Sequence, residues 1–440
     1  MSSPPAADPL SLTPQDIRAE LAGWVTAHWN PGLALREWRR MLADSGWAVP
    51  SWPQRWHGRG LPDWAADVVG DELIRLGAVG TPVGSGMTLA APTILAHGPD
   101  SCRERFLLPT LTGEQTWCQL FSEPGAGSDL AGLTTSAVLR DGEWVVNGQK
   151  VWTTSAHHAD FGMLLARTDS SVPKHQGLTY LAIPMRQDGV LVRPLRQMNF
   201  RQSFNEVFLT DARVPADNVI GEVGGGWAAA LTTLAYERRF GALRKPGYSA
   251  ASGRALDEAR AEADEHFATY QWYPQRAGRA DLVAEHASTA GVSDDPLVRQ
   301  AVAGVLARQQ ASRWTAERAR AARAAGQRPG AEGSIGKLAA SQLARESASA
   351  HSAIAGAAGL LGGPQSWLDG VVAEVLLSVP AQSIAGGTDE IQRNILAERI
   401  LGLPREQAPD RGRPFRDSRA GHGRPAGDNQ AGGPSAPAGG

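Results

Sequence analysis

The sequence predicts an α+β multidomain protein: an N-terminal helical domain, a middle antiparallel β domain and a C-terminal helical bundle. Apolar residues recur at helical spacing from 13 to about 111, alternate with a period of two from 116 to about 220, and return to helical spacing from 226 to 403. A length of 440 residues, 42% of them hydrophobic and 20% charged, accommodates two or three globular domains. We therefore expect a flexible N-terminus at 1–12, followed by domains at 13–115, 116–222 and 223–403.

The first predicted helix begins after Thr13, because a threonine cap precedes a proline at the first helical position. Ile17, Leu21 and Val25 then follow at helical spacing. Glycine and proline interrupt the pattern between residues 50 and 62, and a second helical stretch is expected over 65–76.

The middle part carries the turn and strand signals of a sheet. Asn147-Gly148 separates the runs 143–146 and 149–152, which predicts a two-residue β-hairpin at that point. Further strands are expected where short apolar runs lie between turn residues, at 161–167, 178–184, 190–194 and 205–209.

The last part is predicted to be a helical bundle that ends near residue 403. A long helix is expected over 297–322, and Thr388 caps a final helix that Gly402 ends. The segment 404–440 contains no Leu, Ile, Val or Met and one aromatic residue, Phe415. Such a segment buries too little apolar surface to offset its ordering entropy, so we expect a disordered tail.

Composition and missing motifs exclude several classes of function. The net charge of −2 argues against a nucleic-acid binder, and we expect neither a signal peptide nor a membrane span. Two cysteines make no disulfide framework, which fits the cytoplasm. Nucleotide-fold, P-loop, zinc and serine-hydrolase motifs are missing, and His157-His158 is interpreted as a surface turn, so no metal is expected. Catalysis is then best supplied by an organic cofactor.

Two segments of the middle domain have the chemistry of a binding site. In 121–129, Phe-Ser-Glu-Pro-Gly-Ala-Gly-Ser-Asp, a strand end runs into a glycine-rich turn whose N–H groups suit a phosphate or a ring edge. In 150–155, residues two apart share a face of a strand, so Trp152 and Thr154 suit a flat heterocycle. An ordinary β-turn and a half-buried strand are the alternatives.

Two segments of the C-terminal half are less distinctive. Glu237 and Arg238 lie in 235–239, where a carboxylate among basic residues is either a general base or a solvated helix face. The segment 386–393, Gly-Gly-Thr-Asp-Glu-Ile-Gln-Arg, is a helix start whose simplest role is a cap.

These four segments, in this order and at these separations, resemble the acyl-CoA dehydrogenase family from Thr13 to about Leu403, and most of all its actinobacterial branch with steroid side-chain dehydrogenases. The resemblance implies an FAD flavoprotein that converts an acyl-CoA thioester to its trans-2-enoyl-CoA. It implies electron-transfer flavoprotein as the electron acceptor.

The resemblance also assigns roles to residues. Trp152 would pack on the isoalloxazine, Thr154 would hydrogen-bond flavin N5, and Thr388 and Glu390 would contact the FAD of the same chain. The positions that would line the flavin and substrate cleft are Gln119, Phe121, Ser122 and Ser128.

The chain departs from the family pattern at the usual position of the catalytic base. Most members have a glutamate immediately before the last Gly-Thr, where this chain has Gly386. Two branches take the base from an early C-terminal Glu-Arg pair, which Glu237-Arg238 matches. The resemblance therefore implies Glu237 as the base and Arg238 as a neighbour of substrate or flavin.

A second departure concerns contacts that homomeric relatives lend to the neighbouring subunit's FAD. Their Arg-x-x-Phe-Gly segment is replaced by 287–295, and a glutamine is replaced by Ala353. We therefore expect an α2β2 hetero-oligomer with a related acyl-CoA dehydrogenase subunit. Two alternatives stay open: a non-catalytic structural subunit of such a heteromer, and an acyl-CoA oxidase on the same fold.

Overall fold

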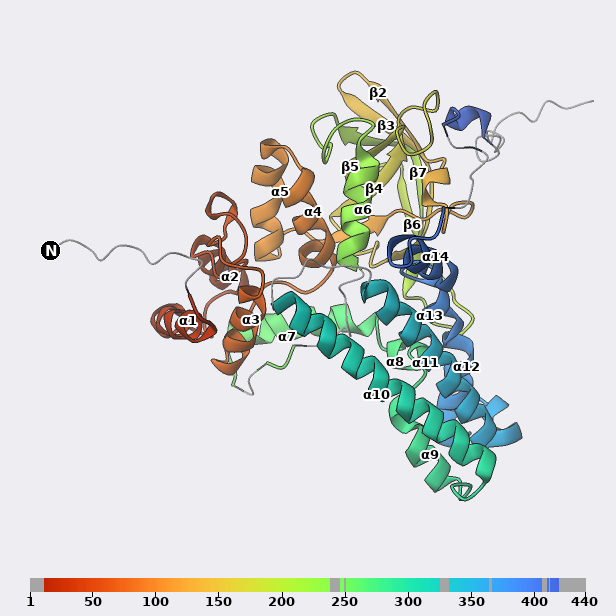
Figure 1. Cartoon of the computed structure of the whole chain (residues 1–440). Coiled ribbons are helices and arrows are strands. Elements are labelled where there is room, and N and C mark those ends of the chain that lie inside the picture. Colours follow the sequence, from red (N-terminus) through yellow and green to blue (C-terminus); the bar gives the residue numbers. More distant parts are fainter. Residues whose placement is uncertain are drawn as a thin grey trace, which may run out of the picture.

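The computed structural model describes residues 12–237, 246–248, 251–324, 332–363, 366–405, 410 and 412–418. Figure 1 shows N-terminal helices at the left, a curled sheet at the upper right and C-terminal helices at the lower right, in the chain order helices, sheet, helices. This arrangement confirms the predicted fold class.

The first helix begins where the sequence predicts. Thr13 caps the first helix in a capping box: its hydroxyl accepts from the Asp16 amide, and the Asp16 carboxylate accepts from the Thr13 amide at 2.9 Å. Ile17, Leu21 and Val25 are buried along one face. The elements are α1 (Pro14–His28), α2 (Leu35–Asp44), η2 (Gln54–Trp56), α3 (Ala65–Arg75), the π-helical turn η3 (Gly86–Ala90), α4 (Ala91–His97) and α5 (Asp100–Thr112).

The middle domain is one seven-stranded sheet in the order β1-β4-β2-β3-β7-β6, with β5 on β4. Most pairs are antiparallel, but β1 runs parallel to β4 and a single parallel bridge joins β2 to β4. The strands are β1 (Trp117–Leu120), β2 (Ser136–Arg140), β3 (Glu143–Thr154), β4 (Phe161–Arg167), β5 (Leu178–Pro184), β6 (Val190–Leu195) and β7 (Phe204–Pro215), and a short turn η4 (Leu130–Gly132) follows β1.

The predicted hairpin at Asn147-Gly148 is wrong, because β3 runs through these residues as one strand. The two-residue turn lies earlier, at Asp141-Gly142, where φ is +51° and +83°. Gly148 is needed for close approach instead: a Cβ there would lie 2.7 Å from the Thr135 Cα. The Asn-Gly pair therefore marks an irregularity inside a long strand.

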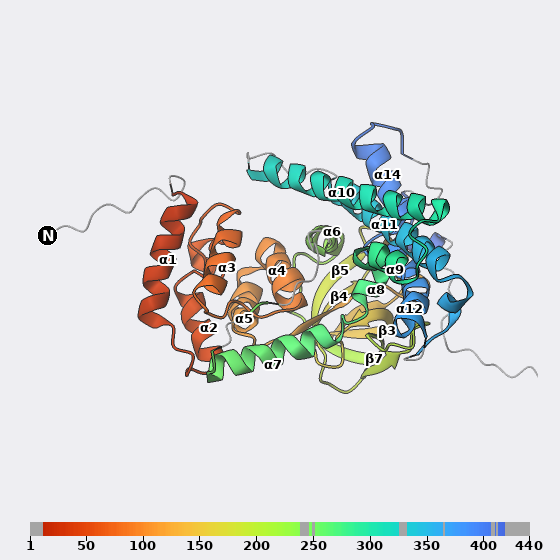
Figure 2. The same cartoon turned by 90° about the horizontal axis from the view of Figure 1, so that it is seen from below.

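Helix α6 (Gly226–Glu237) joins the N-terminal helices to the sheet. It lies between α4 and β5, and Figure 2 shows it end-on at this place. Small residues allow the close packing: a Cβ on Gly226 would lie 2.6 Å from the Thr179 carbonyl carbon. The Thr233 hydroxyl pairs with Thr93 at 2.9 Å and with the Tyr180 hydroxyl at 3.0 Å. These buried contacts fix where the C-terminal end of α6 lies.

The C-terminal bundle is built around α11, which packs against α9, α10, α12, α13 and α14. The predicted long helix and the predicted final helix are both present. The elements after α6 are α7 (Arg254–Ala268), α8 (Tyr273–Arg276), η5 (Ala280–Leu282), α9 (Val283–Thr289), α10 (Pro296–Ala324), α11 (Glu332–Ala355), η6 (Gly356–Leu360), η7 (Trp367–Gly370), α12 (Val371–Ser378), α13 (Pro380–Ile384) and α14 (Asp389–Arg399).

One stretch, Trp367–Arg399, is long and apolar enough by length and composition to cross a membrane. In the structure this stretch is not one continuous helix. Val379 separates α12 from α13, and Gly386 and Gly387, with φ of +68° and +85°, separate α13 from α14.

Most of the segment 404–440, predicted to be disordered, lies outside the described residues, but residues 410 and 412–418 are described. Residues 412–418 contact the β domain and form the short turn η8 (Phe415–Asp417), and the Phe415 side chain is 4% exposed. The single aromatic residue of the tail anchors this contact, which composition averaged over 37 residues of the tail, 404–440, did not reveal.

Candidate functional site

The glycine-rich turn follows β1 and folds back on itself. The amides of Glu123 and Ala126 each donate to the other's carbonyl, at 3.0 and 3.1 Å. Gly125 and Gly127 are exposed, and no atom lies within 4 Å of a Cβ built on either. Phe121 is buried, Ser122 is half-buried and Ser128 is exposed. The turn therefore presents an open, glycine-lined backbone to its surroundings.

A buried ion pair ties this turn to β3, and the sequence analysis missed it. The Lys150 side chain is 0% exposed, and its Nζ donates to Glu123 Oε1 at 2.9 Å and to the carbonyls of Phe121 and Leu165 at 3.0 and 2.8 Å. The Val151 amide also donates to the Ser122 carbonyl at 2.9 Å. The one available signal was a lysine inside a predicted strand, since a charge buried there needs a partner.

Glu123 is held ionised by its surroundings. The amides of Thr134 and Thr135 donate to its carboxylate at 2.7 and 2.9 Å. Burial alone would raise the pKa of Glu123, but the Lys150 charge and these hydrogen bonds outweigh it and lower the pKa to about 2. Burial lowers the pKa of Lys150.

A β-bulge places Trp152 outside the regular pleat. Lys150 pairs with Val207 and Thr153 with Asn205, so Val151 and Trp152 together oppose one residue of β7. Trp152 has φ of +63°, is 56% exposed and meets the Phe204 ring edge-on at 5.8 Å. The regular alternation assumed for Trp152 and Thr154 is therefore interrupted, and Thr154 itself is half-buried.

The structure brings Glu237 to Gln119. Glu237 ends α6, and Gln119 Nε2 donates to Glu237 Oε2 at 3.4 Å. Both side chains are half-buried, and Gln119 lies on β1, two residues before the glycine-rich turn. The carboxylate is also near Tyr273: burial raises the pKa of the Tyr273 phenol, and the negative charge of Glu237 adds to the rise. Arg238 lies outside the described residues.

The start of α14 is fixed by charge from α11. Asp389 is buried and accepts from Lys337 Nζ at 2.9 Å and Arg345 at 2.6 Å. Burial raises its pKa, but hydrogen bonds from Lys337, Ser341 and Arg345 outweigh burial and lower the pKa to about 2. Thr388 caps the helix by accepting from the Ile391 amide at 3.3 Å.

Thr388 and Glu390 make contacts within the α14 region, where Glu390 pairs with Arg393 at 3.3 Å. Among the described residues no hydrogen bond links either of them to the β domain. The structure thus links β1 to α6 through Gln119 and Glu237, links the glycine-rich turn to β3 through Glu123 and Lys150, and leaves the α14 residues in the bundle.

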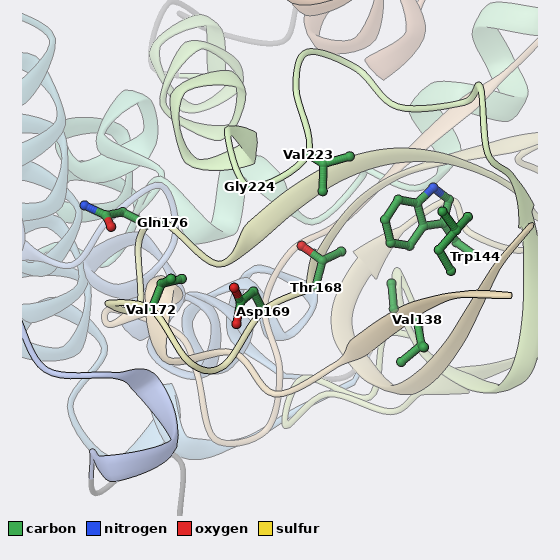
Figure 3. Close-up of a pocket in the computed structure, with 10 residues that line it drawn as sticks. Val138, Trp144, Thr168, Asp169, Val172, Gln176, Val223 and Gly224 are labelled. Atoms are coloured by element: carbon green, nitrogen blue, oxygen red, sulfur yellow. The ribbon is translucent and has the colours of Figure 1, made fainter.

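A separate cavity of about 470 Å³ lies on the β domain, and Figure 3 shows its lining. No predicted site residue lines it. Its walls come from β2, β3 and two loops, namely Ala137, Val138, Leu139, Trp144, Thr168, Asp169, Val172, Gln176, Val223 and Gly224.

Family models match most of the chain. The N-terminal, middle and C-terminal domains of acyl-CoA dehydrogenase match residues 15–114, 118–212 and 224–401. The chain belongs to the acyl-CoA dehydrogenase family, whose members are FAD-dependent flavoproteins and oxidoreductases.

Two mycobacterial relatives illustrate the similarity. Acyl-CoA dehydrogenase FadE34 of Mycobacterium tuberculosis is 38% identical over 84% of this chain, which spans about half of that relative (47%). Acyl-CoA dehydrogenase IpdE1 of the same organism is 35% identical over 84% of this chain and 88% of the relative.

Two solved structures are similar over most of the chain. They are the Tcur3481-Tcur3483 steroid ACAD and the ChsE4-ChsE5 complex from Mycobacterium tuberculosis. Each has a TM-score of 0.61 and 26% identity and covers 92% of this chain and all of its own.

The residues present fit an FAD. The exposed indole of Trp152 offers a stacking surface, and the open backbone around Gly125 and Gly127 offers N–H groups to a ring edge or phosphate. Both lie on segments that the Lys150–Glu123 pair holds together.

Proposed function

We propose that this chain removes the α-proton and β-hydride of an acyl-CoA thioester, forming the trans-2-enoyl-CoA, with Glu237 as the base. The observation that carries the proposal is the Gln119–Glu237 contact, which brings the end of α6 to the strand that leads into the glycine-rich turn. A base must lie within hydrogen-bond reach of the proton it removes, and this end of α6 adjoins the proposed cleft.

The chain's own residues would act as follows. The Glu237 carboxylate accepts the α-proton, and the Gln119 amide orients that carboxylate through the 3.4 Å contact. Ser128, and Arg238 beyond the described end of α6, would contact the substrate. When bound, FAD supplies the hydride acceptor.

The cofactor would be held from two sides. On the β domain the contacting residues are Gln119, Phe121, Ser122, Ser128, Trp152 and Thr154. On α14, Thr388 and Glu390 would contact the same cofactor, with the start of the helix fixed by the Asp389 ion pairs.

A related acyl-CoA dehydrogenase subunit would complete an α2β2 assembly. The two similar complexes named above support this, as do exposed apolar side chains concentrated in the C-terminal bundle. The segment 287–295 lacks the arginine and phenylalanine of homomeric relatives, and the Ala353 side chain has no hydrogen-bonding group to replace their glutamine. Examples of the exposed apolar residues are Leu297, Trp314, Leu360, Leu361, Ile384 and Leu401.

The acyl group is proposed to be bulky and sterol-derived. One similar structure is named a steroid ACAD, and Gly386 leaves open the place where other members carry a glutamate, since no atom lies within 4 Å of a Cβ built there. We further propose electron-transfer flavoprotein as the acceptor and the cytoplasm as the compartment.

The test is turnover of the complex with its partner subunit, in wild type and Glu237→Gln. We expect kcat to fall by several orders of magnitude with FAD content unchanged, because an amide cannot accept the proton. Glu222→Gln, an exposed carboxylate just before α6, is the matched control and should keep wild-type turnover.

Near-normal turnover of Glu237→Gln would refute the assignment and favour the first alternative, a non-catalytic subunit. Hydrogen peroxide produced stoichiometrically in air would favour the second alternative, an acyl-CoA oxidase. Neither alternative is favoured by a feature of the described residues.

A further inference from the structure

The described tail residues 410 and 412–418 lie outside the family match, which ends at residue 401. We call them the C-terminal strap. Its backbone bonds to the loop between β4 and β5: the amides of Phe415 and Arg416 donate to the carbonyls of Val172 and Ser170 at 2.9 and 3.0 Å. The turn η8 lies beside this loop, close to Val172 (Figure 3).

The side chain of Phe415 covers a buried arginine. The guanidinium carbon of Arg167 lies 3.4 Å from the centre of the Phe415 ring, and both side chains are about 5% exposed or less. Arg167 donates to the carbonyls of Ala131, Leu133 and Lys174, at 2.6, 3.2 and 3.1 Å. One residue under the strap thus holds both the β4–β5 loop and the segment immediately after the glycine-rich turn.

Lys174 makes a second link. Its Nζ lies 2.9 Å from the carboxylate of Asp129, the last residue of the turn segment, and 2.8 Å from that of Asp410 in the strap. Burial lowers the pKa of Lys174, but the hydrogen bonds that it donates to the carboxylates of Asp410 and Asp129 outweigh burial and raise it. The next residue, His175, packs edge-on against Trp227 at the start of α6, with ring centres 4.8 Å apart.

We infer that the C-terminal strap positions the flavin-site turn: Phe415 and Asp410 hold Arg167 and Lys174, which hold residues 129–133 in place. The inference rests on the proposed function, because it takes the turn to be a cofactor contact. Phe415 and Asp410 are positioning residues, since they act through Arg167 and Lys174. Residues 129–133 directly continue the turn that carries Ser128, so loosening them shifts the contacts of that turn.

The experiment uses the full chain in complex with its partner subunit and compares Phe415→Ala and Asp410→Asn with wild type. Asp417→Asn is the matched control, because it removes one exposed strap carboxylate that has no contact with Lys174. Hydrogen exchange is followed in peptides covering 129–135 and 168–177, with 178–184 as an internal reference. FAD retention is measured separately as the dissociation constant from flavin fluorescence.

In Phe415→Ala we expect exchange in both peptides to rise at least tenfold and the FAD dissociation constant to rise about fivefold, with 178–184 unchanged. Asp410→Asn should give a smaller change in the same direction, since Lys174 keeps Asp129. Phe415→Leu, which fills the site without a ring over Arg167, should lie between Phe415→Ala and wild type.

Unchanged exchange in Phe415→Ala would overturn docking of the strap. Faster exchange with an unchanged FAD dissociation constant would overturn the positioning role while leaving the docking. If the wild-type complex bound no FAD, the proposed function would fail, and the exchange data would still report on the strap separately.

Discussion

The turn after β1 and the start of α14 are each fixed by a buried carboxylate, but the charges that satisfy these carboxylates differ in exposure. Glu123 is paired with Lys150, which is fully buried. Asp389 is paired with Lys337 and Arg345, whose side chains are 12% and 45% exposed. If Lys150 is lost, the Glu123 carboxylate stays buried without a counter-charge. If Asp389 is lost, the charges of Lys337 and Arg345 can be hydrated. The two sites should therefore respond differently to the loss of one partner.

The largest expected effect is that of Lys150→Met. It leaves the Glu123 carboxylate buried without its counter-charge, which costs about 3–5 kcal/mol of unfolding free energy. Urea unfolding measures this loss. The double variant Lys150→Met/Glu123→Leu should recover most of it, because both charges are then removed. A single variant as stable as wild type would show that the pair does not fix the turn.

The second largest effect is expected from acid, which should reduce the contribution of Glu123 to the unfolding free energy. The folded pKa of Glu123 is about 2 against an ordinary 4.5. The contribution of Glu123 to the unfolding free energy is fully present above pH 4.5 and is lost as the pH falls through about 2. At ~1.4 kcal/mol per pKa unit this contribution is roughly 3 kcal/mol. Unfolding free energies measured between pH 5 and pH 3 should fall less steeply in the double variant than in wild type. If the unfolding free energies of both proteins fell equally with pH, Glu123 would not contribute to the acid sensitivity.

The smallest of these effects is expected for Asp389→Asn, at about 1–3 kcal/mol. Lys337 and Arg345 lose a partner but reach water, so the loss should be smaller than that in Lys150→Met. Asp44→Asn, which breaks an exposed pair with Arg40, is the control and should change the unfolding free energy by about 0.5 kcal/mol or less. A loss in Asp389→Asn larger than that in Lys150→Met would reverse the comparison.

The sequence allowed the order of the helical and β regions to be predicted because periodicity reports burial directly. The cap at Thr13 and the final helix after Thr388 followed from local rules and are confirmed. The hairpin at Asn147-Gly148 failed because the close approach of Thr135, a contact across strands, decides what Gly148 does.

Other features depend on contacts that no local pattern encodes. The bulge at Trp152 arises from the pairing of β3 with β7. Phe415 packs on Arg167, which lies nearly 250 residues earlier in the chain. The Lys150–Glu123 pair also joins segments that only the sheet brings together. Gln119 and Glu237, by contrast, were both selected as site residues from motifs, and the structure places them in contact.

The central claim is tested most directly by anaerobic titration of the co-expressed complex with a panel of acyl-CoAs, in wild type and in Glu237→Gln. We predict that bulky acyl-CoAs bleach the flavin absorbance of the wild-type complex and leave that of the Glu237→Gln complex unbleached at equal FAD content. Bleaching of both complexes at the same rate would contradict the claim that Glu237 removes the α-proton.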